Sequence, residues 1–447
     1  MGRIRSSFRS SLLALLLIAG LLPACLIFAQ EPELPTLRGN ITAVQPPDGF
    51  DVDGYHVVIS PATQFFALKG PKKDQGELRR LIAIGTYVQV IGNKDRHTRT
   101  VAARQVKVRD DEDRTLSGFS VIDRIFSRGP LPVFRADGYT FRLSTNTEIS
   151  FSDGINSVSD IDTGTWVHYE GKRYEAGEVI AASVKFVKPK LHKSKRDPAS
   201  VVQVTRFPAG SLIDFDGTFR TDREKHRMED AGGQCGWYPV PENAELQERV
   251  RRIGVSVVPR YQRGLPDDDS AKIPFRFYAV EEKGIRSDLS CNDGLVLVPL
   301  NVLERLQNDD QLAAVLADGV AANLQRQRAR VGIELSWLKA AEAASYVLIS
   351  PAGIASTKII EHELLRKLED ERGRMALALM ADAGYDPWQA PEAWRLLDSK
   401  RPPRDPAKLK YPYRAGYQLE ILGLQYKPAT PSTTTATQAG NASTKQD

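Results

Sequence analysis

The sequence is poor in the residues that build metal and redox sites. Its 447 residues include three cysteines and six histidines, and no two histidines stand four positions apart. A zinc-binding H-E-x-x-H helix needs two histidines at that spacing to turn both rings toward one ion. The chain also has no G-x-S-x-G elbow, no Walker loop and no G-x-G-x-x-G turn after a strand. These absences exclude the standard templates for zinc, serine and nucleotide chemistry.

The first thirty positions contain no acidic residue, and Glu31 is the first acid in the chain. Three arginines precede an apolar run over residues 12–28, an order typical of a secretory signal. We therefore expect residues 1–29 to be a signal peptide and the remaining chain to be exported, to the periplasm or the extracellular medium. Cleavage after Ala29, lipidation at Cys25 and an uncleaved anchor stay open as three outcomes. This N-terminal segment is the only membrane contact that the sequence predicts.

The charge balance argues against a nucleic-acid partner. The formal net charge of +5 falls to +2 without the three signal arginines, which is too weak for a general polyanion binder. The basic run 188-KPKLHKSKR-196 is expected to be part of a solvated linker over residues 189–200, with a local polyanion site as the alternative. Residues 428–447 contain no large apolar side chain to bury and are expected to be a disordered tail.

Two cysteines remain beyond the signal, Cys235 and Cys291. In an oxidising compartment an even pair favours one disulfide, with two buried thiols as the alternative. Neither has a second cysteine or a histidine at metal-ligand spacing, so a zinc knuckle is not expected. A Cys-His nucleophile built on Cys291 is the least favoured possibility.

An internal duplication occupies residues 36–188. At an offset of 79, 36-TLRG-39 returns as 115-TLSG-118, 85-GTYVQVIGNK-94 as 164-GTWVHYEGKR-173, and 101-VAARQVKV-108 as 180-IAASVKFV-187. The segment 53-DGYHVVIS-60 returns as 137-DGYTFRLS-144 at an offset of 84. Alternating apolar residues between Gly, Asp and Asn predict short strands joined by turns. We expect two tandem all-β modules, 36–109 and 115–188, each resembling a small OB-like barrel with a structural or docking role.

Residues 201–425 change to helical spacing and carry longer motifs. The segments, in order, are 294-GLVLVPLNVLERLQ-307, 309-DDQLAAVLADGVAANLQRQ-327 and 369-EDERGRMALALMADAGYDPWQAPEAW-394. Residues 237 to about 400 resemble the soluble catalytic domain of the HtpX and CAAX-prenyl-endopeptidase family of gluzincin zinc metallopeptidases. The resemblance implies an α+β, mainly helical metallopeptidase-like domain, and zinc metalloendopeptidase activity where the zinc site is intact.

The zinc motif itself is missing at the matching position, where the chain reads 318-DGVAA-322. The two histidine positions hold Asp318 and Ala322, the catalytic base position holds Gly319, and only Glu371 remains at the place of the family's third ligand. We therefore expect neither bound zinc nor another cofactor. A hard cation held by Asp318 and Glu371 is a weaker alternative, because two carboxylates without a third fixed ligand bind poorly.

A second partial match lies at 362-HELLR-366. His362 and Glu363 copy half of the zinc motif, but Arg366 takes the place of the second histidine. A permanently charged guanidinium would repel zinc, so we expect this segment to be an exposed helix face.

The favoured function is a non-catalytic pseudoenzyme that binds a polypeptide partner of the cell envelope by strand addition. The strand at 294–300 is expected to lie at the sheet edge, with Val296 or Val298, whichever faces outward, meeting the partner. Two alternatives stay open. One is an active zinc metalloendopeptidase with unconventional ligands, and the other is an envelope scaffold whose β modules bind glycan.

Overall fold

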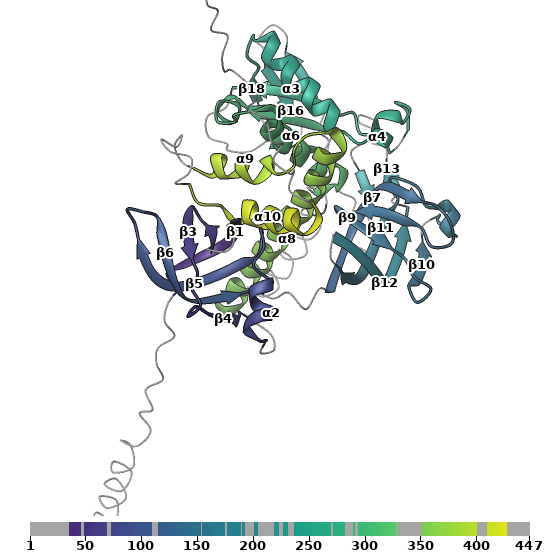
Figure 1. Cartoon of the computed structure of the whole chain (residues 1–447). Coiled ribbons are helices and arrows are strands. Elements are labelled where there is room, and N and C mark those ends of the chain that lie inside the picture. The colour runs from purple at the N-terminus through teal and green to yellow at the C-terminus, as the bar shows by residue number, and fades with distance from the viewer. Residues whose placement is uncertain are drawn as a thin grey trace, which may run out of the picture.

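The chain consists of an all-β N-terminal part followed by a mainly helical C-terminal part (Figure 1). The computed structural model describes residues 35–45, 49–68, 73–109, 115–152, 154–174, 177–188, 190–192, 201–203, 219–222, 227–230, 237–269, 271–281, 289–290, 294–327, 330, 351–399 and 409–426. The expected signal peptide, the expected tail and both cysteines of the expected disulfide, Cys235 and Cys291, lie outside the described residues.

The first barrel contains six short strands and one helix. In order they are β1 (Leu37–Gln45), β2 (Gly49–Val52), β3 (Tyr55–Val58), β4 (Gln64–Ala67), α2 (Gln75–Arg80), β5 (Tyr87–Asp95) and β6 (Thr100–Val108). The order β3-β2-β1-β5-β6 closes into a five-stranded barrel because β3 pairs in parallel with β6. Strand β4 pairs with β6 as well. Successive side chains alternate between the two faces of each strand, and the inward set forms a separate apolar core that includes Val88, Val90 and Val106.

The second barrel repeats this topology. Its elements are β7 (Thr115–Ser127), β8 (Val133–Ala136), β9 (Tyr139–Arg142), β10 (Glu148–Ser152), the 3-10 turn η1 (Val158–Asp160), β11 (Trp166–Arg173) and β12 (Glu178–Val187). The order β9-β8-β7-β11-β12 closes through a parallel β9–β12 pair, and β10 joins β12 in parallel. Two closed five-stranded barrels are what the expectation of small OB-like modules requires.

The two copies share a turn conformation, but two of their strands are offset differently from the repeat read in the sequence. Asp53 and Asp137 begin matching turns with φ of 52° and 54°, at the offset of 84 expected from sequence. Ile41 and Ile122 occupy equivalent ladder positions, since their amides bond Thr86 and Thr165, so the first strand is offset by 81 instead of 79. A shift of two residues keeps the same side chains inward, and the sequence pattern therefore could not reveal it.

The last strand of the repeat is offset by 78, because β3 and β9 pair with Val101 and Val179 at matching positions. The sequence alignment matched Val101 with Ile180 instead and was wrong by one residue. Val101 and Val179 are both fully buried, whereas Ile180 is 40% exposed. A shift of one residue exchanges the inner and outer faces, so burial decides the correct register.

The helical part surrounds one long buried helix, α6 (Asp309–Leu324). The other helices are α3 (Ala244–Val257), α4 (Arg260–Gly264), α5 (Leu300–Leu303), α8 (Pro351–Ala383), α9 (Gln389–Asp398) and α10 (Tyr413–Gln425). The side chain of Asn308 caps α6 by accepting from the amide of Gln311 at 2.8 Å, and two aspartates in the first turn favour the positive end of the helix dipole. Helix α6 packs against α3, α8 and α9.

A small three-stranded sheet with the order β18-β20-β19 accompanies these helices, formed by β18 (Arg276–Val280), β19 (Leu289–Ser290) and β20 (Leu295–Pro299). Strand β20 is therefore the central strand of this sheet. The sequence-based expectation that it lies at the sheet edge was wrong. Val296 and Val298 are both fully buried, so neither faces outward. An unbroken apolar run is typical of a strand covered on both faces, whereas a half-exposed strand alternates.

Short strands also occur between the second barrel and α3. They are β13 (Lys190–His192), β14 (Val201–Gln203), β15 (Phe219–Asp222), β16 (Arg227–Asp230) and β17 (Trp237–Pro239). Strand β13 lies within the expected linker and pairs with β14, so this stretch of residues 189–200 is not purely a linker.

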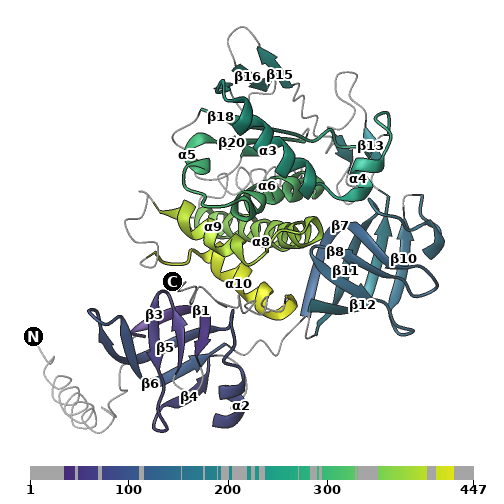
Figure 2. The same cartoon turned by 45° about the horizontal axis from the view of Figure 1, so that its top comes forward.

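Helix α10 lies between the first barrel and the other helices (Figure 2). Its backbone approaches the barrel so closely that a Cβ on Gly423 would lie 2.1 Å from the carbonyl oxygen of Ile84, and one on Gly85 would lie 2.3 Å from that of Leu419. Only glycine fits at either position. None of the helices in the described part of the chain is both long and apolar enough to span a membrane.

Candidate functional site

Ion pairs occupy residues 318–322, the segment that the sequence resemblance aligns with a zinc motif. Asp318 lies on α6 with its side chain fully buried. Its Oδ1 accepts a hydrogen bond from Arg414 of α10, and its Oδ2 lies 3.1 Å from Nε of Arg372 on α8, although that contact lacks hydrogen-bond geometry. The Arg414 guanidinium stacks on Trp394 of α9 at 3.4 Å from the ring centroid. We call Asp318, Arg372 and Arg414 the Asp318 cluster.

The other two positions of this segment that the resemblance aligns with zinc-site residues, Gly319 and Ala322, supply no ligand atom from their side chains. The backbone carbonyl of Gly319 accepts hydrogen bonds from Ser290 Oγ and Asn323 Nδ2, each at 3.0 Å. Ala322 is 8% exposed and carries only a methyl group. Within the described ranges, no group of three or more His, Cys, Asp or Glu side chains is arranged to hold a metal ion.

Glu371, which the resemblance aligns with a third zinc ligand, is also paired with an arginine. It is 1% exposed, and its Oε2 lies 2.7 Å from Nη1 of Arg330. Asp318 and Glu371 thus sit on packed helices, yet each carboxylate has its own guanidinium. Because arginine stays charged at every accessible pH, these residues do not fit a zinc ion. The same contacts weigh against a hard cation shared by the two acids.

Sequence reasoning found the two acids but missed their partners. The sequence contains one hint of a partner for Asp318, because Arg372 directly follows Glu371 in the chain. Arg414 is 96 positions from Asp318, and no local pattern connects them. The partial motif at 362 was interpreted correctly, because His362 and Glu363 are exposed on α8.

A further buried ion pair joins the second barrel to α8. Asp137, in the turn after β8, accepts a hydrogen bond from Arg374 and another from the Tyr169 hydroxyl at 2.5 Å. Burial raises the pKa of Asp137, and burial also raises the pKa of Tyr169 well above its ordinary value. In the first barrel the equivalent Asp53 accepts from the amide of Tyr411, just before α10. The repeated turn therefore docks each barrel onto the helical part.

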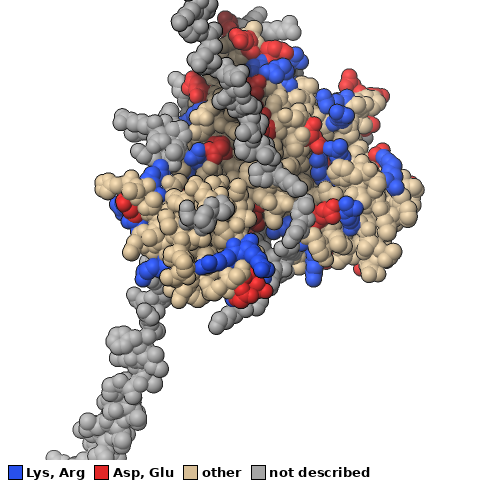
Figure 3. All heavy atoms as spheres, in the orientation of Figure 1, with Lys and Arg blue, Asp and Glu red and all other residues tan. Residues whose placement is uncertain are grey.

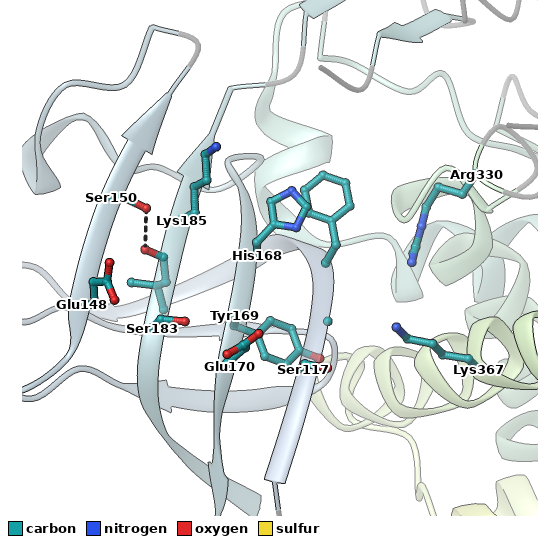
Figure 4. Close-up of a pocket in the computed structure, with 13 residues that line it drawn as sticks. Ser117, Glu148, Ser150, His168, Tyr169, Glu170, Ser183, Lys185, Arg330 and Lys367 are labelled. Carbon is teal, nitrogen blue, oxygen red and sulfur yellow. Dashed lines mark hydrogen bonds between the residues drawn. The ribbon is translucent and has the colours of Figure 1, made fainter. Parts of the chain in front are cut away.

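A pocket of about 380 Å³ lies between the second barrel and the helical part (Figure 4). The barrel contributes side chains from β7, β10, β11 and β12, and the helical part contributes Arg330 and Lys367. In Figure 4 these two cations point from the helical side toward the barrel strands. Elsewhere the charges are dispersed: on the face drawn in Figure 3, Lys, Arg, Asp and Glu form small mixed groups on a mostly uncharged surface.

Strand register arranges the barrel wall of this pocket in two rows. The first row runs across four strands as Phe119, His168, Lys185 and Ser150, which are consecutive cross-strand partners. The second row runs beside it as Ser117, Glu170, Ser183 and Glu148. Side chains opposite one another in neighbouring strands lie close enough to act on one ligand together.

The first barrel lacks this combination at the equivalent positions. Its first row reads Arg38, Gln89, Lys107 and Phe66, and the position of Glu170 in the second row holds Ile91. The stacked pair and the acids are therefore specific to the second copy. No sequence motif marked these rows, because they combine single residues from four separate strands.

One comparison with known proteins concerns the first barrel. Residues 38–107 match a family model described as a domain of unknown function (DUF5666). The match covers β1 to β6 except for the ends of the first and last strands. No curated protein matches the chain.

Proposed function

We propose that this protein is a non-catalytic, metallopeptidase-like binding protein of the cell envelope. Its helical part, residues 237 to about 400, keeps the order of segments of the HtpX and CAAX-prenyl-endopeptidase family and serves as a scaffold that holds the two barrels. Binding rather than hydrolysis is its function. The observation that carries the proposal is the Asp318 cluster, which puts two guanidinium groups where the family has a zinc ion.

The route of binding differs from strand addition on β20. That strand already has a neighbour on each side, and its side chains are buried, so it offers no free edge to a peptide. The scaffold alternative fits better, with the second barrel carrying the ligand pocket. An active peptidase with unconventional ligands is disfavoured because the described acids at the site are neutralised by arginine.

Metal analysis combined with a broad proteolysis assay tests the proposal. Protein purified without chelators or added metal should contain far less than one zinc per chain and should not cleave unfolded casein, with or without added zinc. Stoichiometric zinc, or cleavage that a chelator abolishes, would overturn the proposal.

Restoring the motif tests the blocking role of the arginines. The triple variant Asp318→His, Gly319→Glu, Ala322→His should not take up zinc, because Arg372 and Arg414 stay beside it. The matched control adds Arg372→Ala and Arg414→Ala to the same triple variant, and it should bind zinc at least roughly tenfold more tightly, a gain of about 1.4 kcal/mol. Uptake of one zinc by the triple variant alone would show that the arginines do not exclude the metal.

A further inference from the structure

The pocket beside the second barrel combines three kinds of recognition. An aromatic surface, a row of hydrogen-bonding acids and hydroxyls, and cations from the helical part all meet in one volume of about 380 Å³. This size falls in the range of small-ligand sites, roughly 300–1,000 Å³. Each of the three features limits what the ligand can be.

The aromatic surface is formed by Phe119 and His168. Their rings are stacked with centroids 3.9 Å apart and planes 17° apart, and the centroid of the Trp166 ring lies 4.7 Å from that of Phe119. The face of an aromatic ring is electron-rich and attracts the weakly positive C–H groups of a ligand. A sugar ring presents such a C–H face, so this surface suits a pyranose as well as a planar ring.

The second row argues against a polyphosphate or a nucleic acid. Glu148 and Glu170 are exposed and flank Ser183 in that row. Their carboxylates accept hydrogen bonds from hydroxyl groups but repel nearby phosphates. A ligand rich in hydroxyl groups satisfies this row.

The cations require an acidic group on the opposite side of the ligand. Arg330 is 8% exposed and is held by Glu371 at 2.7 Å, so its guanidinium has a fixed position. Lys367 of α8 and Lys185, between His168 and Ser150 in the first row, also line the pocket and are exposed. Arginine and lysine form charge-assisted hydrogen bonds with a carboxylate.

We infer that this pocket binds an acidic oligosaccharide, a short chain of sugar rings that carry carboxylates. One ring packs against the outer side of the stacked Phe119–His168 pair, its hydroxyl groups donate to Glu148 and Glu170, and its carboxylate faces Arg330 and Lys367. The inference goes beyond the loss of catalysis and does not depend on it, because none of these residues belongs to the Asp318 cluster.

Calorimetric titration of the full chain with tetragalacturonate tests the inference. Two further probes isolate its parts: the fully methyl-esterified tetramer keeps the rings without the charge, and tripolyphosphate keeps the charge without the rings. Tetragalacturonate should bind at least roughly tenfold more tightly than its ester, which corresponds to about 1.4 kcal/mol. Tripolyphosphate should not bind.

Variants assign the binding to this pocket. His168→Ala removes half of the stacked pair, and Lys367→Ala removes a cation from an exposed helix position, so each should weaken tetragalacturonate binding at least roughly fivefold. Gln89→Ala changes the equivalent position of the first barrel and should leave the affinity unchanged. Circular dichroism of each variant verifies that the fold is kept.

Three results would overturn the inference. They are equal affinity for the acid and its ester, equal or tighter binding of tripolyphosphate, and no binding of tetragalacturonate by the unmodified protein. None of them touches the metal and proteolysis measurements, so a failure here leaves the non-catalytic assignment to be judged by its own test.

Discussion

Replacing Arg414 by methionine should destabilise the helical part by about 3 kcal/mol, because it leaves a buried carboxylate with poor compensation. Asp318 is fully buried, whereas the side chains of Arg414 and Arg372 are 11% and 26% exposed. Methionine has a similar length but lacks the guanidinium that stacks on Trp394 and carries the charge. Arg372 remains at 3.1 Å from Oδ2 without hydrogen-bond geometry, so it compensates only in part.

Removing the acid should cost less than removing the base. In Asp318→Asn the two arginines are left without their carboxylate, but both reach water, and the loss should be about 1–2 kcal/mol. The double variant Asp318→Asn, Arg414→Met should be more stable than the sum of the single losses predicts, with a coupling of about 1–2 kcal/mol. This asymmetry follows from the different exposure of the two partners.

Urea unfolding followed by tryptophan fluorescence measures these differences, since Trp394 lies directly under the Arg414 guanidinium. Midpoints are compared only between variants with equal slopes, because a chain of several domains need not unfold in one step. The control is Arg251→Met on α3, whose partner Glu248 is 56% exposed, and it should cause no measurable change. If Arg414→Met proves as harmless as this control, Asp318 is not a buried charge that depends on arginine, and the argument against zinc fails.

Three further results are expected. Burial raises the pKa of Asp370 to about 6, so the folded protein holds the carboxyl proton of Asp370 more tightly than the unfolded chain does. The stability that this proton adds to the fold is complete below about pH 4 and is lost as the pH rises through 6. The side chain of Asn in Asp370→Asn can still accept a hydrogen bond from the Tyr413 hydroxyl. The variant should therefore add about 1–2 kcal/mol to the free energy of unfolding at pH 8 and almost nothing at pH 3.5. An equal effect at both pH values would contradict this. Gly423→Ala should loosen α10 from the first barrel at a cost of about 1–3 kcal/mol, seen as faster amide hydrogen exchange around Ile84; unchanged exchange would mean that the two backbones do not touch. Val298→Lys should sharply lower the soluble yield, because it buries an unpaired charge in a central strand, and a stable, soluble variant would restore the edge assignment.

The sequence alone identified the repeat and the change from strands to helices, because both are local patterns. Alternation of period two marks each barrel strand, and the capping residue and first-turn acids mark the start of α6. Local pattern has limits even there. The two-residue shift of the first strand leaves the inward face unchanged, so only the pairing of Ile41 and Ile122 with their neighbours shows it.

Tertiary structure alone decided what surrounds each functional position. Whether β20 is central or at an edge depends on β18 and β19, which pair with it from other parts of the chain. The sequence placed Asp318 at a histidine position of the expected zinc motif, but its charge is compensated by arginines of α8 and α10, and nothing in its own helix shows this. The pocket rows combine single residues from four strands with cations from the helical part. Sequence periodicity records which face of an element is buried, whereas ion partners and strand neighbours depend on contacts between residues that are far apart in the chain.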